Sequence, residues 1–255
     1  MNGFHLEQLL TGAVFMGARI SGLMVFCPFL GSDAIPTQVK GALTLGITAL
    51  VYVLHGPLQI SLSVWQWAGV GLSEAMIGLL LGLTANFMLE APLMAGQALG
   101  MQMGYSLASL FDPNTQADTP VLATLHQLAA LLIFLQLDVH HWLLRAVVRS
   151  FSYLPTGAAL GFAALSGLLQ GAGGIFLAGV QIAAPALAAT LIADVALGFL
   201  GKASPQMPVL FIGLSVKNLL GLAIMVAMMA YWPASFGARL ATGVGMGERL
   251  LHLSH

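Results

Sequence analysis

The chain has 255 residues, of which 58% are hydrophobic and only 7% are charged, and its formal net charge at pH 7 is -1. Soluble domains contain roughly 25% charged residues, so this composition indicates a protein that is embedded in a membrane or assembled at one. A nearly neutral chain without a run of basic residues offers no footprint for nucleic acid, which excludes nucleic-acid-binding proteins as a class.

Apolar segments follow one another along the chain, and none of them alternates with the two-residue period of a strand. They comprise residues 9–30, 42–54, 64–89, 91–111, 121–137, 158–200 and 209–232. The predicted fold class is therefore all-α. A helix needs about 20 residues to cross the hydrocarbon core, which makes the second segment short and the sixth, if straight, about 65 Å long.

The long segment 158–200 has two possible courses. Gly171, Gly173 and Gly174 offer a point at which the chain could fold back into two helices. Alternatively, the segment is one helix that extends beyond the bilayer. Pro185 would kink the segment in either case.

A change of composition near residues 152–157 predicts a boundary that divides residues 1–157 from residues 158–255. The C-terminal region contains two long apolar stretches joined by a turn that includes Pro205 and Gln206. Proline and polar residues at this density favour a turn over a continuous helix. We therefore expect the C-terminal region to be a helical hairpin followed by a tail.

Glycines at four-residue spacing form two sets, a pair and a longer row. The pair is Gly78 and Gly82, and the row is Gly96, Gly100 and Gly104. This spacing places the members of each set on one helix face, where missing side chains let a neighbouring backbone approach closely. We predict that both sets are helix-packing surfaces.

Four charged residues interrupt the apolar segments: Arg19, Glu74, Asp194 and Lys217. Near mid-bilayer each charge costs about 2.5–3.5 kcal/mol, so these side chains must avoid lipid. One interpretation is a proton or solute relay. The other is a set of pairs between helices or between subunits, or charges close to helix ends.

A single local cluster suggests a metal, formed by Asp138, His140 and His141 with His126 upstream. On a helix the two adjacent histidines point about 100° apart, and the spacing of known zinc motifs is absent, so we predict no metal site. The sequence also lacks the motifs of nucleophilic catalysis and of phosphate or dinucleotide binding. We expect neither enzymatic activity nor a cofactor.

Several short motifs follow one another in a fixed order over some 200 residues. They are Arg19-Ile20-Ser21-Gly22-Leu23-Met24 with Pro28, Ile35-Pro36 before Lys40, Glu74 ahead of Ile77-Gly78-Leu79, Ala95-Gly96-Gln97, Gly104-Tyr105-Ser106, Asp112-Pro113, Pro120-Val121-Leu122, Ser150-Phe151 with Pro155 and Gly157, Ser204-Pro205-Gln206-Met207, and Lys217-Asn218 with Gly221. Their order and spacing resemble the FliR family of the flagellar type III export apparatus, which has injectisome counterparts. Pro208 stands where family members usually have asparagine, a departure that concerns only the local turn.

The resemblance implies a single subunit that joins five FliP-type and four FliQ-type proteins in a helical, cone-shaped export gate for unfolded polypeptide. Residues 1–157 would then be FliP-like, and residues 158–255 would form the FliQ-like hairpin. A FlhB-type switch protein would wrap the cytoplasmic entrance. The gate would belong to the bacterial inner membrane at the flagellar basal body, contact lipid, and lie largely above the hydrocarbon plane.

The resemblance also places the plug of the channel near residues 105–120. A narrow apolar ring excludes water and ions, so we predict that Leu107, Leu110 and Phe111 line the closed gate. Asp112 and Pro113 would set the turn of the loop across the pore. In the simpler alternative, Phe111 only packs beneath a surface turn.

Two other classes of protein stay open from the residues alone. A secondary transporter would also explain the buried charges, but it predicts inverted repeats, and the halves of the chain show no convincing repeat. An intramembrane enzyme would need a nucleophile and base or two metal ligands on facing helices. Within the family, the sequence does not separate a flagellar from an injectisome subunit, although its motifs favour the flagellar one.

Overall fold

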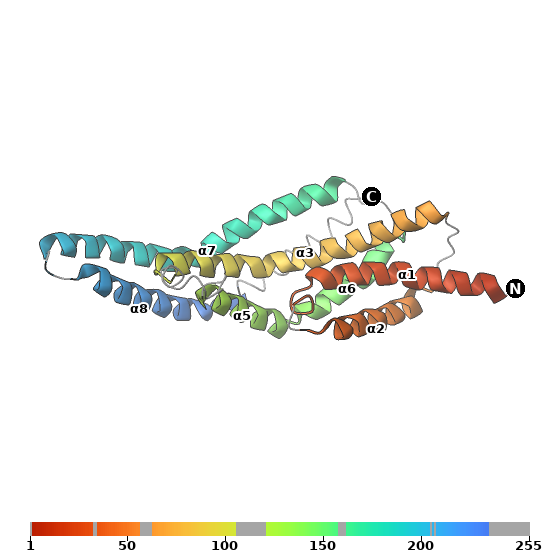
Figure 1. Ribbon diagram of the computed structural model, residues 1–255, viewed down its shortest axis with the longest axis horizontal. Helices are drawn as coiled ribbons and strands as arrows, with labels where there is room; N and C mark the ends of the chain where they lie inside the picture. Colours follow the sequence, from red (N-terminus) through yellow and green to blue (C-terminus); the bar gives the residue numbers. More distant parts are fainter. Residues whose placement is uncertain are drawn as a thin grey trace. The chain divides into compact units, whose positions relative to one another are not determined.

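The computed structural model describes residues 2–32, 35–56, 63–105, 121–157, 162–204, 206 and 208–234. Within these ranges the regular secondary structure is entirely helical, which confirms the predicted all-α class. The main helices, shown in Figure 1, are α1 (Asn2–Phe26), α2 (Thr37–His55), α3 (Val64–Gln102), α5 (Val121–Gln136), α6 (Val139–Tyr153), α7 (Phe162–Ala203) and α8 (Val209–Met229).

The described residues form two compact units. Unit 1 comprises those within 1–88 and 134–172, and unit 2 comprises those within 89–133 and 173–239. Helices α3, α5 and α7 therefore each contribute to both units. The sequence predicts a boundary near residue 157, between a FliP-like and a FliQ-like part. Dividing the chain into compact units does not test that likeness, so the boundary stays a prediction.

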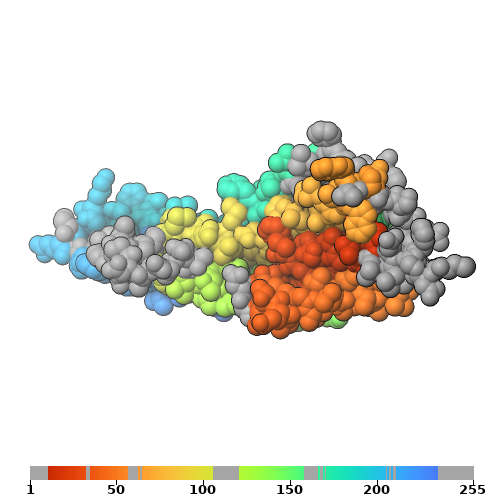
Figure 2. Space-filling view, turned by 45° about the vertical axis from the view of Figure 1, so that its right-hand side comes forward, coloured from red at the N-terminus to blue at the C-terminus, as the bar shows by residue number. Residues whose placement is uncertain are grey.

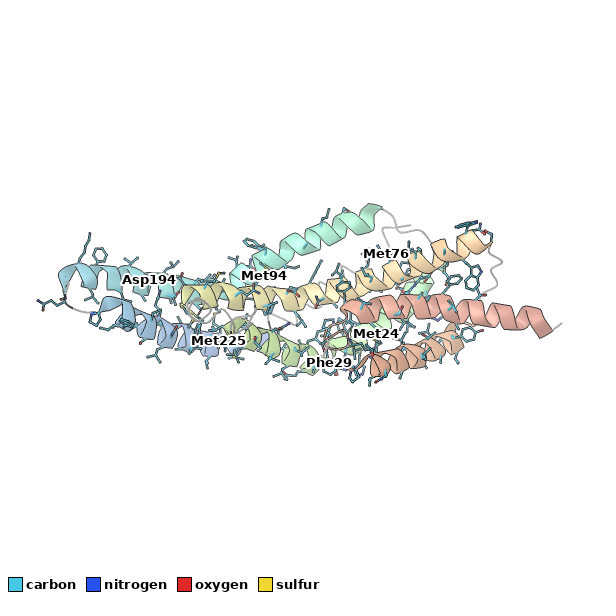
Figure 3. The ribbon with its side chains drawn as sticks, in the orientation of Figure 1. Met24, Phe29, Met76, Met94, Asp194 and Met225 are labelled. Carbon is cyan, nitrogen blue, oxygen red and sulfur yellow. The ribbon has the colours of Figure 1, made fainter. Side chains whose placement is uncertain are left out.

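Unit 1 is built around α1, which packs against α2 and against the first half of α3 (Figure 1). Its fully buried apolar side chains come from several helices and include Phe15, Ile20, Ile77 and Leu154. Burial of each such side chain stabilises the fold by about 1.5–3 kcal/mol relative to exposure. Met24 and Phe29, labelled in Figure 3, mark the end of α1 and the turn that follows it.

Unit 2 has a core of small and medium side chains drawn from α3, α5 and α7. Its buried members are Ala95, Leu99, Met103, Leu122, Ala183 and Ala186, and α8 adds the partly buried Leu222, Ile224 and Met225. At Gly221 of α8 the Met103 sulfur lies 2.6 Å from the position that a Cβ would take. The missing side chain of Gly221 thus leaves room for the Met103 side chain against α8.

Helix α3 joins two apolar segments that the sequence pattern predicts to be separate. It runs for 39 residues with Pro92 inside it. A proline lacks the N–H that would bond to the carbonyl four residues earlier, which here belongs to Met88. The division between the two units falls directly after Met88.

Helix α7 decides between the two courses considered for its segment. It is one helix of 42 residues, about 63 Å long at 1.5 Å per residue, and it does not fold back at its glycines. The division between the units nevertheless falls between Ala172 and Gly173, within that glycine-rich stretch. Glycines offer no side chain for packing, so the helix continues where the packed core is interrupted.

Four helices of the described residues have the length and apolar composition to cross a membrane: α2, α3, α7 and α8. The pair α5 and α6, bent by 64°, would make a fifth if it counts as one broken span. Helix α2 reaches 19 residues because residues 37–41 add a helical turn before its apolar run, so the predicted segment was too short. Only 11% of the apolar window of α2, and likewise of α8, is buried, and the surface of α2 lies open in Figure 2.

Candidate functional site

Arg19 and Glu74 form an ion pair that is wholly enclosed in unit 1. Arg19 Nε donates a hydrogen bond of 2.7 Å to Glu74 Oε2, and both side chains are 0% exposed. Arg19 Nη1 donates to Ser150 Oγ at 2.9 Å, and Nη2 donates to the Leu154 carbonyl at 3.0 Å. The guanidinium thereby connects α1 to α3, to α6 and to the turn after α6.

Two further contacts complete this buried network. The Phe151 ring covers the guanidinium, with 4.0 Å between Arg19 Cζ and the ring centroid. The second carboxylate oxygen of Glu74 accepts a hydrogen bond of 3.1 Å from the backbone N–H of Gly157. Such enclosure favours the interhelical pair over a proton or solute relay, because a relay needs access to water on at least one side.

The pair forms because the backbones of α1 and α3 touch. A Cβ added to Gly78 would overlap the Arg19 carbonyl oxygen, and one added to Gly22 would overlap the Ala75 carbonyl oxygen. A Cβ at Gly82 would lie 2.6 Å from a backbone oxygen of α1. The Gly78 and Gly82 pair therefore faces α1, and a glycine on α1 meets it from the opposite side.

Asp194 and Lys217 form the corresponding pair in unit 2. Lys217 Nζ of α8 lies 2.9 Å from Asp194 Oδ1 of α7, which is labelled in Figure 3. Gln102 Nε2, at the end of α3, donates a hydrogen bond of 2.9 Å to Asp194 Oδ2. The lysine side chain is 16% exposed and the aspartate 40%, so this pair keeps contact with its surroundings.

Gly96 and Gly100 lie on α3, where both are buried. A Cβ at Gly96 would lie 2.7 Å from the Leu122 carbonyl oxygen, so the α3 and α5 backbones meet at this point. Gly104 has a different place from the one expected, because α3 ends at Gln102 and does not continue to residue 111.

Gly104 instead caps the end of α3. Its φ of 84° is left-handed, its N–H bonds to the Met101 carbonyl at 3.2 Å, and the Tyr105 N–H bonds to the Gly100 carbonyl at 2.9 Å. These two bonds are the pair that defines a Schellman motif, in which a left-handed glycine satisfies the last carbonyls of a helix. Spacing alone placed Gly104 on the packing face, whereas backbone conformation makes it a terminator.

Comparison with known proteins gives the family. Residues 10–243 match the family described as bacterial export proteins, family 1. The chain is 32% identical to the flagellar biosynthetic protein FliR of Escherichia coli (strain K12) over 212 residues, covering 83% of this chain and 81% of that protein. The chain belongs to the FliR family of bacterial export proteins.

Other FliR-family relatives come from both flagellar and non-flagellar systems. The flagellar biosynthetic protein FliR of Bacillus subtilis (strain 168) is 27% identical over 219 residues, covering 83% of each chain. The surface presentation of antigens protein SpaR of Shigella flexneri is also 27% identical, over 86% of this chain and 85% of that protein. These values confirm the resemblance, but they do not separate a flagellar from an injectisome subunit.

Membership of the FliR family fixes the class of activity. The chain is a membrane protein of the flagellar and type III export family, and not an enzyme. Family membership thus sets aside the transporter and intramembrane enzyme that the buried charges had left open. The same charges form two pairs within the chain, one in each unit.

Several predicted site residues of this FliR-family chain lie outside the described residues. They are the five plug residues Leu107, Leu110, Phe111, Asp112 and Pro113, together with Pro205 of the C-terminal turn. Gln206 is described, and its side chain is exposed. The plug and the turn accordingly stay predictions.

The partners of these charges outside the two ion pairs were not predicted from the sequence. They are the Ser150 hydroxyl and the Leu154 carbonyl on Arg19, the Gly157 N–H on Glu74, and the Gln102 amide on Asp194. A backbone carbonyl gives no signal in a sequence, and Gln102 sits in an apolar run where its partner is 92 positions away. Gly22 did have a signal, since it stands one helical turn after the charged Arg19.

Proposed function

We propose that this chain is the single-copy core subunit of a flagellar type III protein export gate, which helps to form and to plug the channel for unfolded substrates. The observation that carries the proposal is the family match over residues 10–243, together with 32% identity to a flagellar FliR over most of both chains. The exposed apolar helices add support, because a single chain leaves them largely uncovered.

The proposed partners are five FliP-type subunits, four FliQ-type subunits and a FlhB-type switch protein. In this arrangement residues 1–157 are FliP-like and residues 158–255 are the FliQ-like hairpin. With only 11% of the apolar windows of α2 and α8 buried, neighbouring subunits and lipid have a large surface to cover. Burying apolar surface drives association at roughly 25 cal/mol per Å² before the cost of ordering is subtracted.

The proposed location is the bacterial inner membrane at the flagellar basal body, with the gate largely above the hydrocarbon plane. Helix lengths support this. At 39 and 42 residues, α3 and α7 measure about 58 and 63 Å, roughly twice the 30 Å of a hydrocarbon core. Helices of that length extend into surroundings other than lipid, where sister subunits can contact them.

The proposed plug is the segment that comes after the Gly104 cap. Leu107, Leu110 and Phe111 would close the channel with apolar surface, while Asp112 and Pro113 set the turn. A hydrophobic constriction excludes water, and with it ions, while the channel is idle. The cap supports this role because it gives the segment a defined starting point.

The plug is tested by replacing residues 106–118 with a Gly/Ser linker of equal length in the assembled complex. Conductance of ions through the complex in planar bilayers should rise. The matched control replaces residues 57–62 with Gly/Ser and should leave the conductance unchanged. Unaltered conductance after the first replacement removes the plug assignment.

The function itself is tested by expressing the chain in a bacterium that lacks its own FliR. Restored motility, together with an intact-complex mass that fits one copy of this chain, supports the flagellar gate. The alternative is an injectisome subunit of the same family, which the 27% identity to SpaR leaves open. Rescue of injectisome secretion without rescue of motility would decide for that alternative.

A further inference from the structure

The corner between α5 and α6 gathers three side chains that can bind a metal ion. The two helices are bent by 64° relative to each other, and Asp138 occupies the corner in a left-handed conformation, with φ 54° and ψ 30°. His140 and His141 follow in the first turn of α6. The left-handed residue turns the chain so that the aspartate carboxylate lies beside this first turn.

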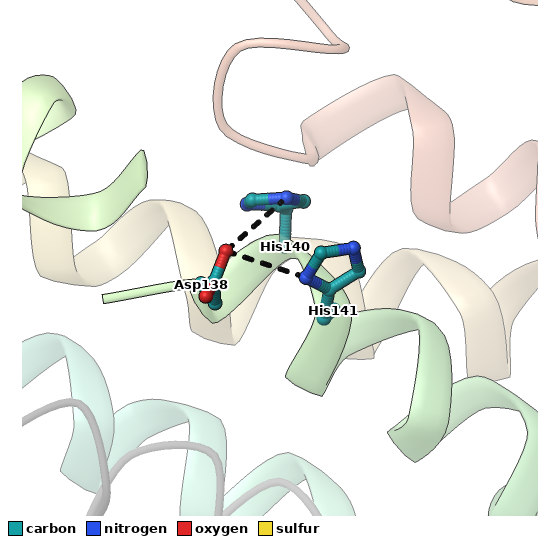
Figure 4. A group of neighbouring side chains, drawn as sticks. All are labelled: Asp138, His140 and His141. Atoms are coloured by element: carbon teal, nitrogen blue, oxygen red, sulfur yellow. Dashed lines mark ion pairs between the residues drawn. The ribbon is translucent and has the colours of Figure 1, made fainter. Parts of the chain in front are cut away.

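Figure 4 shows the resulting arrangement. His141 Nδ1 lies 3.4 Å from Asp138 Oδ1, and His140 Nε2 lies 3.9 Å from the same oxygen. The centroids of the two imidazole rings are 4.2 Å apart. Helical geometry alone had predicted histidines that point apart, but the three ligand atoms lie within 4.8 Å of one another.

These separations are close to those of a metal site. With bonds of about 2.0–2.2 Å, ligand atoms around a tetrahedral zinc ion lie roughly 3.3–3.5 Å apart. Separations of 3.4 and 3.9 Å already lie near that spacing, and a separation of up to 4.8 Å would have to shorten by about 1.3–1.5 Å. Asp138 and His141, which are 68% and 58% exposed, can move with little packing resistance, whereas His140 is 33% exposed.

The two nitrogens of His140 differ in their surroundings. Its Nδ1 is buried and has no hydrogen-bond partner among the described residues, whereas its Nε2 is the nitrogen that faces Asp138. The ring also borders an apolar cavity together with Phe29 and Leu144. Packing on that side restricts ring rotation and keeps Nε2 on the side of the carboxylate.

We propose that Asp138, His140 and His141 form a binding site for a divalent transition-metal ion of the zinc class. One carboxylate oxygen and two imidazole nitrogens suit Zn²⁺ and its neighbours Co²⁺ and Ni²⁺. Three protein ligands leave a fourth position, which is open to water because the cluster is exposed. The bound ion ties the corner residue to the first turn of α6.

The test uses the full chain without an affinity tag, purified in mild detergent and stripped with a chelator. Co²⁺ is titrated while visible absorption is recorded, and Zn²⁺ is then added as a competitor. The expected result is one equivalent of Co²⁺ with the absorption of a nitrogen and oxygen site, displaced by Zn²⁺. Asp138→Asn and His141→Gln should each weaken binding by at least about tenfold.

Both substitutions spare the fold. The side chains are exposed, and asparagine tolerates the left-handed conformation of residue 138. As a matched control, His55→Gln removes an exposed imidazole from α2 and should leave the stoichiometry and affinity unchanged. A second control, His252→Gln with His255→Gln, removes the histidines near the end of the sequence.

Three outcomes overturn the proposal. They are no stoichiometric Co²⁺ binding to the unaltered chain, binding that survives both Asp138→Asn and His141→Gln, and binding that disappears with the His252 and His255 substitutions. Equal thermal unfolding of all metal-free variants rules out misfolding as the cause of a loss. Loss of binding in the cluster variants alone supports the site.

Discussion

The two ion pairs of this chain have contrasting surroundings. In unit 1, Arg19 and Glu74 are fully enclosed, and each nitrogen of the guanidinium donates a hydrogen bond. In unit 2, Lys217 is 16% exposed and Asp194 40%. Removing one partner of an enclosed pair leaves an uncompensated buried charge, whereas water can solvate the remaining partner of an exposed pair.

The contrast separates two uses of the same chemistry. The enclosed pair connects α1, α3 and α6 and stabilises the packing of these helices in unit 1. The accessible pair joins α7 to α8 and also receives Gln102, but it leaves polar atoms at the surface where a neighbouring subunit can reach them. Five predictions test this distinction, in decreasing order of their expected effect.

Arg19→Met should have the largest effect. It leaves Glu74 buried and unpaired, which costs about 3–5 kcal/mol of stability when one partner of a buried pair is lost. Thermal unfolding in mild detergent, followed by circular dichroism, measures the loss. The double variant Arg19→Met with Glu74→Leu should be more stable than Arg19→Met alone, and equal or lower stability would contradict the role of the unpaired charge.

Gly78→Ala should rank second, with a loss of about 1–3 kcal/mol from overpacking. The added Cβ overlaps the Arg19 carbonyl oxygen, so α1 must move away from α3 and the ion pair must stretch. Gly69→Ala in the same helix is the matched control, since a Cβ there has nothing within 4 Å. The control should be neutral or stabilising, because alanine favours a helix over glycine.

Asp194→Asn should cost less than about 1 kcal/mol, because the pair is partly exposed and water replaces much of what is lost. The same unfolding measurement applies. Should this substitution destabilise the chain as much as Arg19→Met does, the distinction between the two pairs would fail.

The rate at which a reagent labels the Cys27 thiol reports how well unit 1 encloses this side chain. Burial raises the pKa of its thiol to about 12, so below pH 8 it stays protonated and a maleimide should label it slowly. Arg19→Met should speed the labelling if it opens unit 1, while Asp194→Asn should not. Rapid labelling of the unaltered chain would contradict the enclosure of this unit.

The same thiol gives a pH dependence. An unfolded cysteine has a pKa of about 8.5, whereas the pKa of the Cys27 thiol in the folded state is about 12. The folded state therefore holds this proton more tightly than the unfolded state does. The contribution of this group to stability is therefore complete below about pH 8.5 and is lost as the pH rises toward 12. Cys27→Ala should remove that part of the alkaline destabilisation.

Sequence patterns were sufficient for the helical class and the membrane setting, because composition and period report directly on burial. They failed where the structure depends on partners remote in sequence. Arg19 and Glu74 were identified as buried charges, but the sequence offered no way to pair residues 55 positions apart. Pairing requires knowledge of which helices touch.

Helix ends were predicted less well than helix faces. The apolar segments 64–89 and 91–111 were expected to be separate, yet α3 runs through their junction and through Pro92 for 39 residues. Gly104 matched the spacing of a packing face, yet its positive φ makes it a cap. At Asp138 a left-handed residue places the carboxylate beside His140 and His141, which residue spacing did not indicate. In each case backbone conformation, which spacing does not encode, decided the outcome.

The cap at Gly104 has a consequence for how this chain can vary. Once the last carbonyls of α3 are satisfied within the cap, the helical phase upstream no longer depends on the residues beyond it. Insertions or deletions after Tyr105 would leave Gly96 against α5. The length of the downstream segment of this chain can therefore change without rotating the helix that precedes it.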